Sequence, residues 1–174
     1  GSDCRDGANG PDLSEPGKAQ LEALQGRLCY QFSDLTLLKR ALTHRSAGKH
    51  HNERLEFLGD AVIGLAAAAA FYDLFPDADE GVLSRLRALV VSGHSLAAIA
   101  KDMDLSSCLI LGESERKSGG RHRDSILADT LEALVGAVAL DANPEKALEV
   151  AAGWLRSAVE SASPSDTIDA KTQL

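Results

Sequence analysis

The stretch HNERLEFLGDAVIGLAAAAAFY, residues 51–72, combines three acidic side chains with a long apolar run. Glu53, Glu56 and Asp60 come first, and twelve apolar or glycine residues follow Asp60 without interruption. That run is too short for a membrane span and has the length of a helix inside a protein core. Because the acids are three and four residues apart, a helix projects all three from one face. The stretch therefore predicts a core helix over about 52–73 that carries acids at its start.

The composition indicates a single all-α domain. Of 174 residues, 44% are hydrophobic and 4% aromatic, so the core is aliphatic and rich in alanine, which favours helices. Three well-separated cysteines, Cys4, Cys29 and Cys108, argue against a disulfide framework or a zinc site. The sequence shows no signal peptide and no apolar run of spanning length. We therefore expect a cytoplasmic protein that has no membrane partner.

Hydrophobic periodicity predicts further helices over about 19–29, 34–43, 80–91, 94–102, 124–141 and 144–161. Ser33 or Asp34 would cap the second of these, and Asn143 followed by Pro144 would open the last. Residues 113–123, ESERKSGGRHR, show two glycines and no periodicity, which predicts a loop. Residues 1–18 are rich in Gly, Pro, Ser and Asp, and we expect them to be a disordered segment derived in part from a tag.

A second apolar helix repeats the arrangement of acids. Asp129 and Glu132 are spaced three apart within the predicted helix 124–141. Grouped carboxylates in apolar surroundings are costly, so we expect a cation to compensate them. Exposure at a helix start is the alternative, and it stays open for Glu53. For Asp60 and Glu132, which core residues flank on both sides, we expect burial.

Carboxylate oxygens suit Mg²⁺ or Mn²⁺, which keep waters for a substrate phosphate, so the expected chemistry is phosphodiester hydrolysis. Cations just before the second acidic helix could contact the phosphates, or they could belong to a solvated loop. These cations are Arg116, Lys117, Arg121, His122 and Arg123. The net charge of −8 argues against a nucleic-acid partner unless the local distribution of charge overrules the total.

The segment ERLEFLGDAV, residues 53–62, resembles the signature of the ribonuclease III family of double-stranded RNA endonucleases. Further segments resemble motifs of that family in order, namely ALTHRSAGKHHN at 41–52, DEGVLSRLRALVVS at 79–92 and SGGRHRDSILADTLEALVGAVALD at 118–141. The resemblance implies a homodimeric helical endonuclease domain over 19–161. Residues 162–174 would then be a linker and the truncated start of a double-stranded RNA-binding domain.

The resemblance also implies roles for individual residues. The catalytic carboxylates would be Glu56, Asp60, Asp129 and Glu132, all four on Mg²⁺ or its substitute Mn²⁺, with Glu53 supporting metal-bound waters and Glu80 in a secondary role. The implied activity is hydrolysis of double-stranded RNA in the processing of ribosomal and other RNA. Each centre of the dimer would cut one strand and leave a 5′-phosphate, a 3′-hydroxyl and a short 3′ overhang.

Other readings remain at this point. A catalytically silent RNA-binding dimer or scaffold would keep the fold, but it has no reason to retain costly acids in a core. A carboxylate-bridged redox bundle would need Glu-x-x-His motifs, and both Glu56 and Glu132 lack them. Phe57, Leu58 and the alanines 66–70 could be core or dimer contacts. His44 could touch RNA or satisfy a buried hydrogen bond, and the structural role is favoured.

Overall fold

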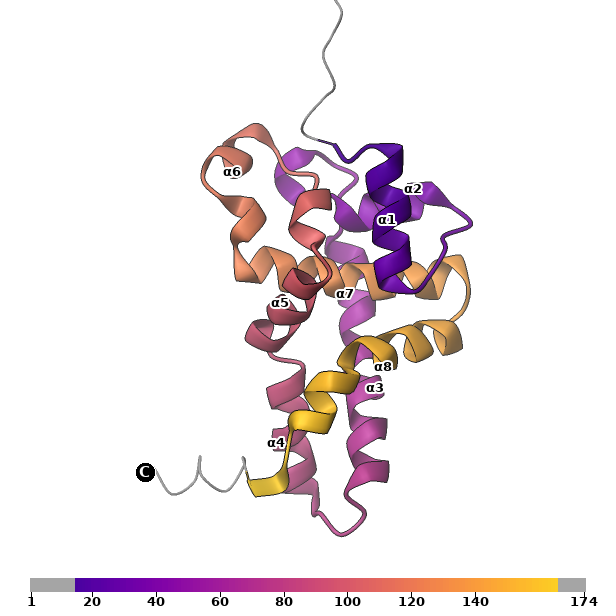
Figure 1. The fold of residues 1–174 in the computed structure, drawn as a ribbon, viewed down its shortest axis with the longest axis vertical. Coiled ribbons are helices and arrows are strands. Elements are labelled where there is room, and N and C mark those ends of the chain that lie inside the picture. The colour runs from indigo at the N-terminus through magenta and orange to yellow at the C-terminus, as the bar shows by residue number, and fades with distance from the viewer. Residues whose placement is uncertain (1–14, 166–174) are drawn as a thin grey trace, which may run out of the picture.

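A computed structural model describes residues 15–165, which are almost wholly helical (Figure 1). The helices are α1 (Lys18–Leu28), α2 (Leu35–Leu42), α3 (Glu53–Leu74), α4 (Glu80–Val90), α5 (Gly93–Asp102), α6 (Glu113–Lys117), α7 (Asp124–Asp141) and α8 (Pro144–Ser161), with 3₁₀ segments η1 (Arg45–Ala47), η2 (Leu105–Cys108) and η3 (Gly120–His122). Among these residues the only β-type pairing is an isolated bridge between Thr43 and Ile110. The predicted all-α fold is confirmed.

The seven helices expected from periodicity begin and end within one residue of their predicted bounds. Two predicted caps are also in place. The Asp34 carboxylate accepts the backbone N–H of Thr36 at 2.9 Å, and the Asn143 side chain accepts that of Lys146 at 2.8 Å. These local hydrogen bonds explain why the helices start where the sequence predicts, because each satisfies a donor that the first turn leaves open.

The predicted loop at 113–123 is wrong in part, because this segment contains α6 and η3. Helix α6 has only five residues, too few to show a hydrophobic period. Charge stabilises it instead. Lys117 lies 2.9 Å from Glu113, one turn earlier, and this orientation of acid before base complements the helix dipole.

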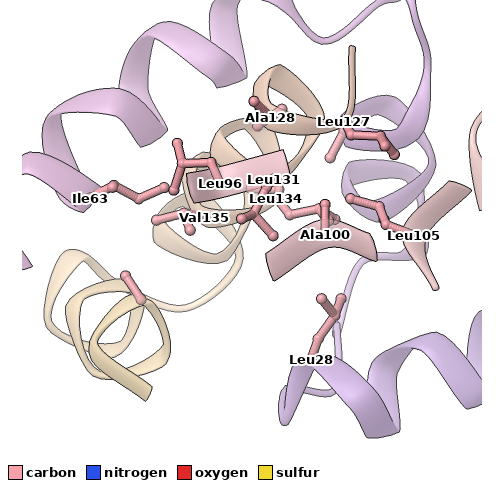
Figure 2. Packing of buried hydrophobic residues seen from close by; sticks show 14 of the residues in the cluster. Leu28, Ile63, Leu96, Ala100, Leu105, Leu127, Ala128, Leu131, Leu134 and Val135 are labelled. Carbon is pink, nitrogen blue, oxygen red and sulfur yellow. The ribbon is translucent and has the colours of Figure 1, made fainter. Parts of the chain in front are cut away.

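Helix α7 forms the centre of the core. Most of its residues between Ile126 and Val138 are buried, and α3 makes the most extensive contact with it. Helices α2, α5 and α8 also pack on α7, which therefore is covered on several sides. Figure 2 shows Leu131 and Val135 of α7 close to Ile63 of α3 and Leu96 of α5. A helix surrounded in this way needs apolar residues around most of its circumference, which is what its sequence supplies.

Two glycines set the distance between α3 and α7. A Cβ atom placed on Gly59 would lie 1.6 Å from the carbonyl oxygen of Glu132, and one placed on Gly136 would lie 2.2 Å from that of Leu55. The helices therefore touch backbone to backbone where they cross, which only glycine permits. Since Glu56 and Asp60 flank Gly59 in α3, the crossing sets them beside the acids of α7.

Helix α3, with 22 residues, meets the length and composition expected of a membrane span. Its Leu55, Ile63 and Ala67 side chains are nevertheless buried in the core that it shares with α7 and α8. It also begins with two acids, Glu53 and Glu56, in its first turn. These features agree with the predicted core helix.

The terminal segments expected from composition fall mostly outside the described residues. Of residues 1–18 the structure describes only 15–18, and Lys18 already begins α1. Of residues 162–174 it describes only 162–165. The disordered first segment and the truncated start of a further domain therefore stay predictions.

Replacing Gly59 by alanine is expected to destabilise the protein by about 3 kcal/mol or more, because a methyl group there meets backbone atoms that cannot rotate away. The control is Gly153→Ala in α8, where nothing lies within 4 Å of the added Cβ. That change should be neutral or stabilise by up to about 1 kcal/mol. Urea unfolding followed by circular dichroism measures both, and equal stabilities would contradict the close crossing.

Candidate active site

The crossing of α3 and α7 brings together the four carboxylates that the sequence singled out. They form two hydrogen-bonded pairs, and each pair joins one helix to the other. Glu56 of α3 is bonded to Asp129 of α7, and Glu132 of α7 is bonded to Asp60 of α3. Glu56 and Asp60 are four residues apart in α3, and Asp129 and Glu132 are three residues apart in α7. With these spacings, each acid of one helix lies beside an acid of the other.

The electrostatics of these pairs are unusual for carboxylates. Burial, then the hydrogen bond to Asp60 and the neighbouring negative charges, raise the pKa of Glu132 to about 8. Burial and the charge of Asp129 raise the pKa of Glu56 to about 7. Burial also raises the pKa of Asp129, although the hydrogen bond from Glu56 opposes this. Glu56 and Glu132 are therefore able to keep a proton near neutral pH.

The site is less buried than the sequence predicts. Glu56, Asp129 and Glu132 are half-buried, but Asp60 is exposed, so the expected burial of Asp60 is wrong. The reason is that α7 covers the face of α3 that carries Leu55 and Gly59, and Asp60 lies at its edge. Glu53 is exposed as well, and exposure at a helix start was one of the two alternatives for this residue.

A cavity of about 200 Å³ opens beside the Glu56–Asp129 pair. Its walls come from the start of α3, the start of α7 and the segment before α3. The lining residues are His44, Arg45, Asn52, Glu53, Glu56, Glu115, Arg123, Ser125, Ile126, Asp129 and Thr130. Two arginines at this cavity are paired with acids. Arg45 lies 3.5 Å from Glu53, and Arg123 lies 3.0 Å from Glu115.

Of the five cations expected near the phosphates, only Arg123 lines this cavity. Arg121 has a structural role, because it donates to the carbonyl oxygens of Ser106 at 3.1 Å and Leu109 at 2.9 Å. Lys117 is engaged with Glu113 on α6. Of the cations predicted to contact phosphates, Arg123 is therefore the one that lines the cavity.

The donor set suits a hard divalent cation, because it consists of carboxylate oxygens and includes no cysteine. As the side chains lie, however, no three His, Cys, Asp or Glu residues within the described part of the chain are arranged to hold an ion. Glu56 is instead hydrogen-bonded to Asp129, and Glu132 to Asp60. A cation could take the place of the protons in these hydrogen bonds if the carboxylates turned toward it, so the residues fit in kind and number.

The structure places Glu80 elsewhere. It lies at the start of α4, accepts a hydrogen bond from Ser84 at 2.8 Å, and lines a separate groove with Tyr72 and Arg87. Glu80 thus lies outside the cavity beside Glu56 and Asp129, and its implied secondary role stays a prediction. Conversely, Glu115 of α6 was not singled out from the sequence, although it anchors Arg123 at the cavity. No periodicity signals such a residue in a five-residue helix.

Comparison with known proteins adds independent information. A family model described as Ribonuclease-III-like matches residues 34–158. The chain is 49% identical over 155 residues to Ribonuclease 3 from Actinobacillus succinogenes, which covers 88% of this chain and 69% of that protein.

Solved structures agree with this match. A nuclease domain of ribonuclease III from Campylobacter jejuni superposes with a TM-score of 0.78 at 40% identity, over 82% of this chain and 98% of that one. A second structure of that domain has a TM-score of 0.77 at 41% identity and covers 79% of this chain and 96% of that one. It was described for flexibility in a region involved in dimer formation.

The pKa of Glu132 leads to a prediction for the metal-free protein. Between the ordinary value of 4.5 and about 8, the folded state keeps a proton that the unfolded state has released, so stability falls as the pH rises through this window. Glu132→Gln removes the ionisation and keeps a donor for Asp60. In EDTA at pH 8.5 its melting temperature should exceed that of the wild type by roughly 2–4 °C, which corresponds to about 1 kcal/mol.

The control for this measurement is Glu22→Gln, which changes an exposed glutamate of α1. It should leave the pH dependence of melting unchanged. A Glu132→Gln protein that melts with the wild type at every pH would contradict the raised pKa.

Proposed function

Because the chain belongs to the ribonuclease III family, we propose that it is a divalent-metal-dependent endonuclease that hydrolyses phosphodiester bonds of double-stranded RNA. The observation that carries the proposal is the arrangement of four carboxylates, two each from α3 and α7, around a backbone contact between glycines. The products would carry 5′-phosphate and 3′-hydroxyl ends with short 3′ overhangs. Processing of ribosomal and other RNA in the cytoplasm would be the cellular role.

In this proposal Glu56, Asp129 and Glu132, with Asp60, hold Mg²⁺, for which Mn²⁺ can substitute. Bound there, the metal supplies a water of lowered pKa and stabilises charge on the phosphate oxygens. The carboxylates also have a second effect, because uncompensated they repel an approaching phosphate. RNA therefore approaches productively only when cations balance Glu56 and Asp129. Glu53, which also lines the cavity, would orient waters.

The distribution of charge makes an RNA partner compatible with a net charge of −8. Arg45 and Arg123 lie at the cavity, and the exposed Lys49 and His50 follow on the same segment before α3. RNA phosphates would compete with Glu53 and Glu115 for the two arginines. Binding through so few phosphate contacts is expected to weaken steeply with salt.

An exposed apolar face on α3 supports a homodimer. Phe57, Leu65 and Tyr72 are 82%, 56% and 73% exposed, and their spacing of eight and seven residues places them on one side of the helix. Large apolar side chains gathered in this way mark an interaction surface. Phe57 is thus a dimer contact in this proposal, while Leu58 is half-buried and Ala66 and Ala67 belong to the core.

The first experiment is cleavage of a fluorescent double-stranded RNA at low salt. Wild-type protein should give staggered products with Mg²⁺ or Mn²⁺ and none with EDTA. Glu132→Gln should cut more than about 100-fold more slowly, because loss of a direct ligand exceeds the 10–100-fold typical of outer-shell residues. Glu22→Gln serves again as the matched control and should cut at the wild-type rate. RNA binding without cleavage by the wild-type protein would instead favour a silent RNA-binding dimer.

The dimer is tested separately by Phe57→Ser. Truncating a central apolar contact should cost about 2 kcal/mol, so the dimer should dissociate at roughly 30-fold higher concentration. The control is Leu140→Ser, since Leu140 is an apolar side chain of another helix, near the end of α7, and is 59% exposed. Analytical ultracentrifugation measures both variants. A wild-type protein that stays monomeric at high micromolar concentration would refute the interface.

A further inference from the structure

The backbone around His44 is firmly held at the edge of the cavity. The His44 N–H donates to the carbonyl oxygen of Ile110 at 2.9 Å, and the His44 carbonyl oxygen accepts the N–H of Ala47 at 2.9 Å. The neighbouring Thr43 forms the bridge to Ile110 and accepts the N–H of Asn52 at 2.9 Å. These three backbone hydrogen bonds hold the main chain at His44 in place, and the imidazole extends from it.

The hydrogen bonds at Nδ1 determine where the ring carries its proton. The Ser46 N–H donates to Nδ1 at 3.1 Å, and the Ser46 Oγ lies 2.8 Å from the same nitrogen. Oγ itself accepts the N–H of Gly112 at 2.9 Å, which leaves its own hydrogen free to point at Nδ1. A nitrogen that accepts from a backbone N–H cannot carry a proton. The neutral ring therefore has its proton on Nε2.

Nε2 is the ring nitrogen that Ser46 does not contact. His44 is half-buried and lines the cavity together with Glu53, Glu56 and Asp129. Nε2 makes no hydrogen bond to any residue of the described part of the chain. The fold thus holds an N–H donor, with no hydrogen-bond partner among the described residues, in a cavity that four carboxylates line.

We propose that His44 is a substrate-contacting residue of the reaction, whose Nε2–H donates to a non-bridging oxygen of the scissile phosphate. This inference rests on the proposed function. A phosphodiester offers only acceptors at its phosphate, and the walls of the cavity offer few donors for it. Arg45 and Arg123 are drawn to Glu53 and Glu115 by charge.

A neutral donor has an advantage in these surroundings. A charged side chain at this position would pair with Glu56 or Asp129 and would compete with the metal for them. The uncharged imidazole contacts an entering oxygen and leaves the carboxylates available. Its rigid attachment through Ser46 means that little ordering is required when the phosphate arrives.

The tautomer can be measured without any assay of activity. Protein labelled with ¹⁵N at its five histidines is examined by two-bond ¹H–¹⁵N correlation at pH 7.5, with His44 assigned by its loss in His44→Asn. We expect Nδ1 of His44 to show the shift of an unprotonated nitrogen and Nε2 that of a protonated one. Ser46→Ala should weaken this preference. A proton on Nδ1 overturns the proposal.

Contact with the phosphate is tested with two matched substitutions. Glutamine is one methylene longer than asparagine, so its amide N–H reaches the region of Nε2, whereas that of asparagine reaches only the region of Nδ1. In single-turnover cleavage at saturating Mg²⁺ and RNA, His44→Asn should lose roughly 10²–10³-fold in rate, as loss of one donor to a reacting oxyanion does. His44→Gln should recover most of this rate, and both should melt within about 2 °C of the wild type.

Equal rate losses in the two variants, or losses that follow a fall in melting temperature, overturn the role of His44 and leave the nuclease in place. A wild-type protein that cuts no RNA overturns the proposed function, and the His44 contact with it. The tautomer measurement tests the hydrogen bonds at Nδ1 separately, since it depends on neither RNA nor metal.

Discussion

The backbone contact between α3 and α7 at Gly59 and Gly136 is the constraint on which the rest of the molecule depends. With a side chain at either position the helices would have to separate, since the nearest atoms are carbonyl groups. Separation would draw Glu56 away from Asp129 and Asp60 away from Glu132. The packing of the core and the geometry of the candidate site therefore depend on each other, because the same crossing buries the apolar face of α7 and sets the distance between the paired acids.

The acids of α7 have different surroundings along the helix. Asp141 at the C-terminal end accepts hydrogen bonds from the Tyr30 hydroxyl at 2.6 Å and from the backbone N–H groups of Ser33 and Asp34 at 2.8 and 2.9 Å. Burial opposes its ionisation, but these donors hold its pKa below the ordinary value. Within the described residues, Asp129 and Glu132 are hydrogen-bonded to other carboxyl groups instead, and burial raises the pKa of both. Asp141 is thus satisfied by donors of the fold itself, whereas the surroundings of Asp129 and Glu132 leave a cation to be supplied from outside in the proposed function.

Sequence reasoning succeeded where the determinant is local. Caps such as Asp34 and Asn143 act within three residues, and apolar periodicity reports the buried face of each helix, so helix bounds were predicted closely. The acids of the site were found because their spacing on a helix is itself local.

The features that sequence reasoning missed depend on contacts between distant segments. The exposure of Asp60 follows from which face of α3 meets α7, and the structural role of Arg121 follows from carbonyl groups of the segment before α6. Likewise, the sequence does not show that the Ser46 N–H donates to Nδ1 of His44, or that Gly112 donates to the Ser46 Oγ and so frees its hydrogen for the same nitrogen. The Nδ1 of His44 satisfies the fold and its Nε2 remains free for a ligand.

Helix α3 divides its surface in the same way, since Gly59 faces α7, Asp60 lies at the edge, and Phe57 is exposed one turn before Asp60. One helix thus supplies the closest packing contact of the core, an acid of the candidate site and the most exposed apolar side chain of its surface.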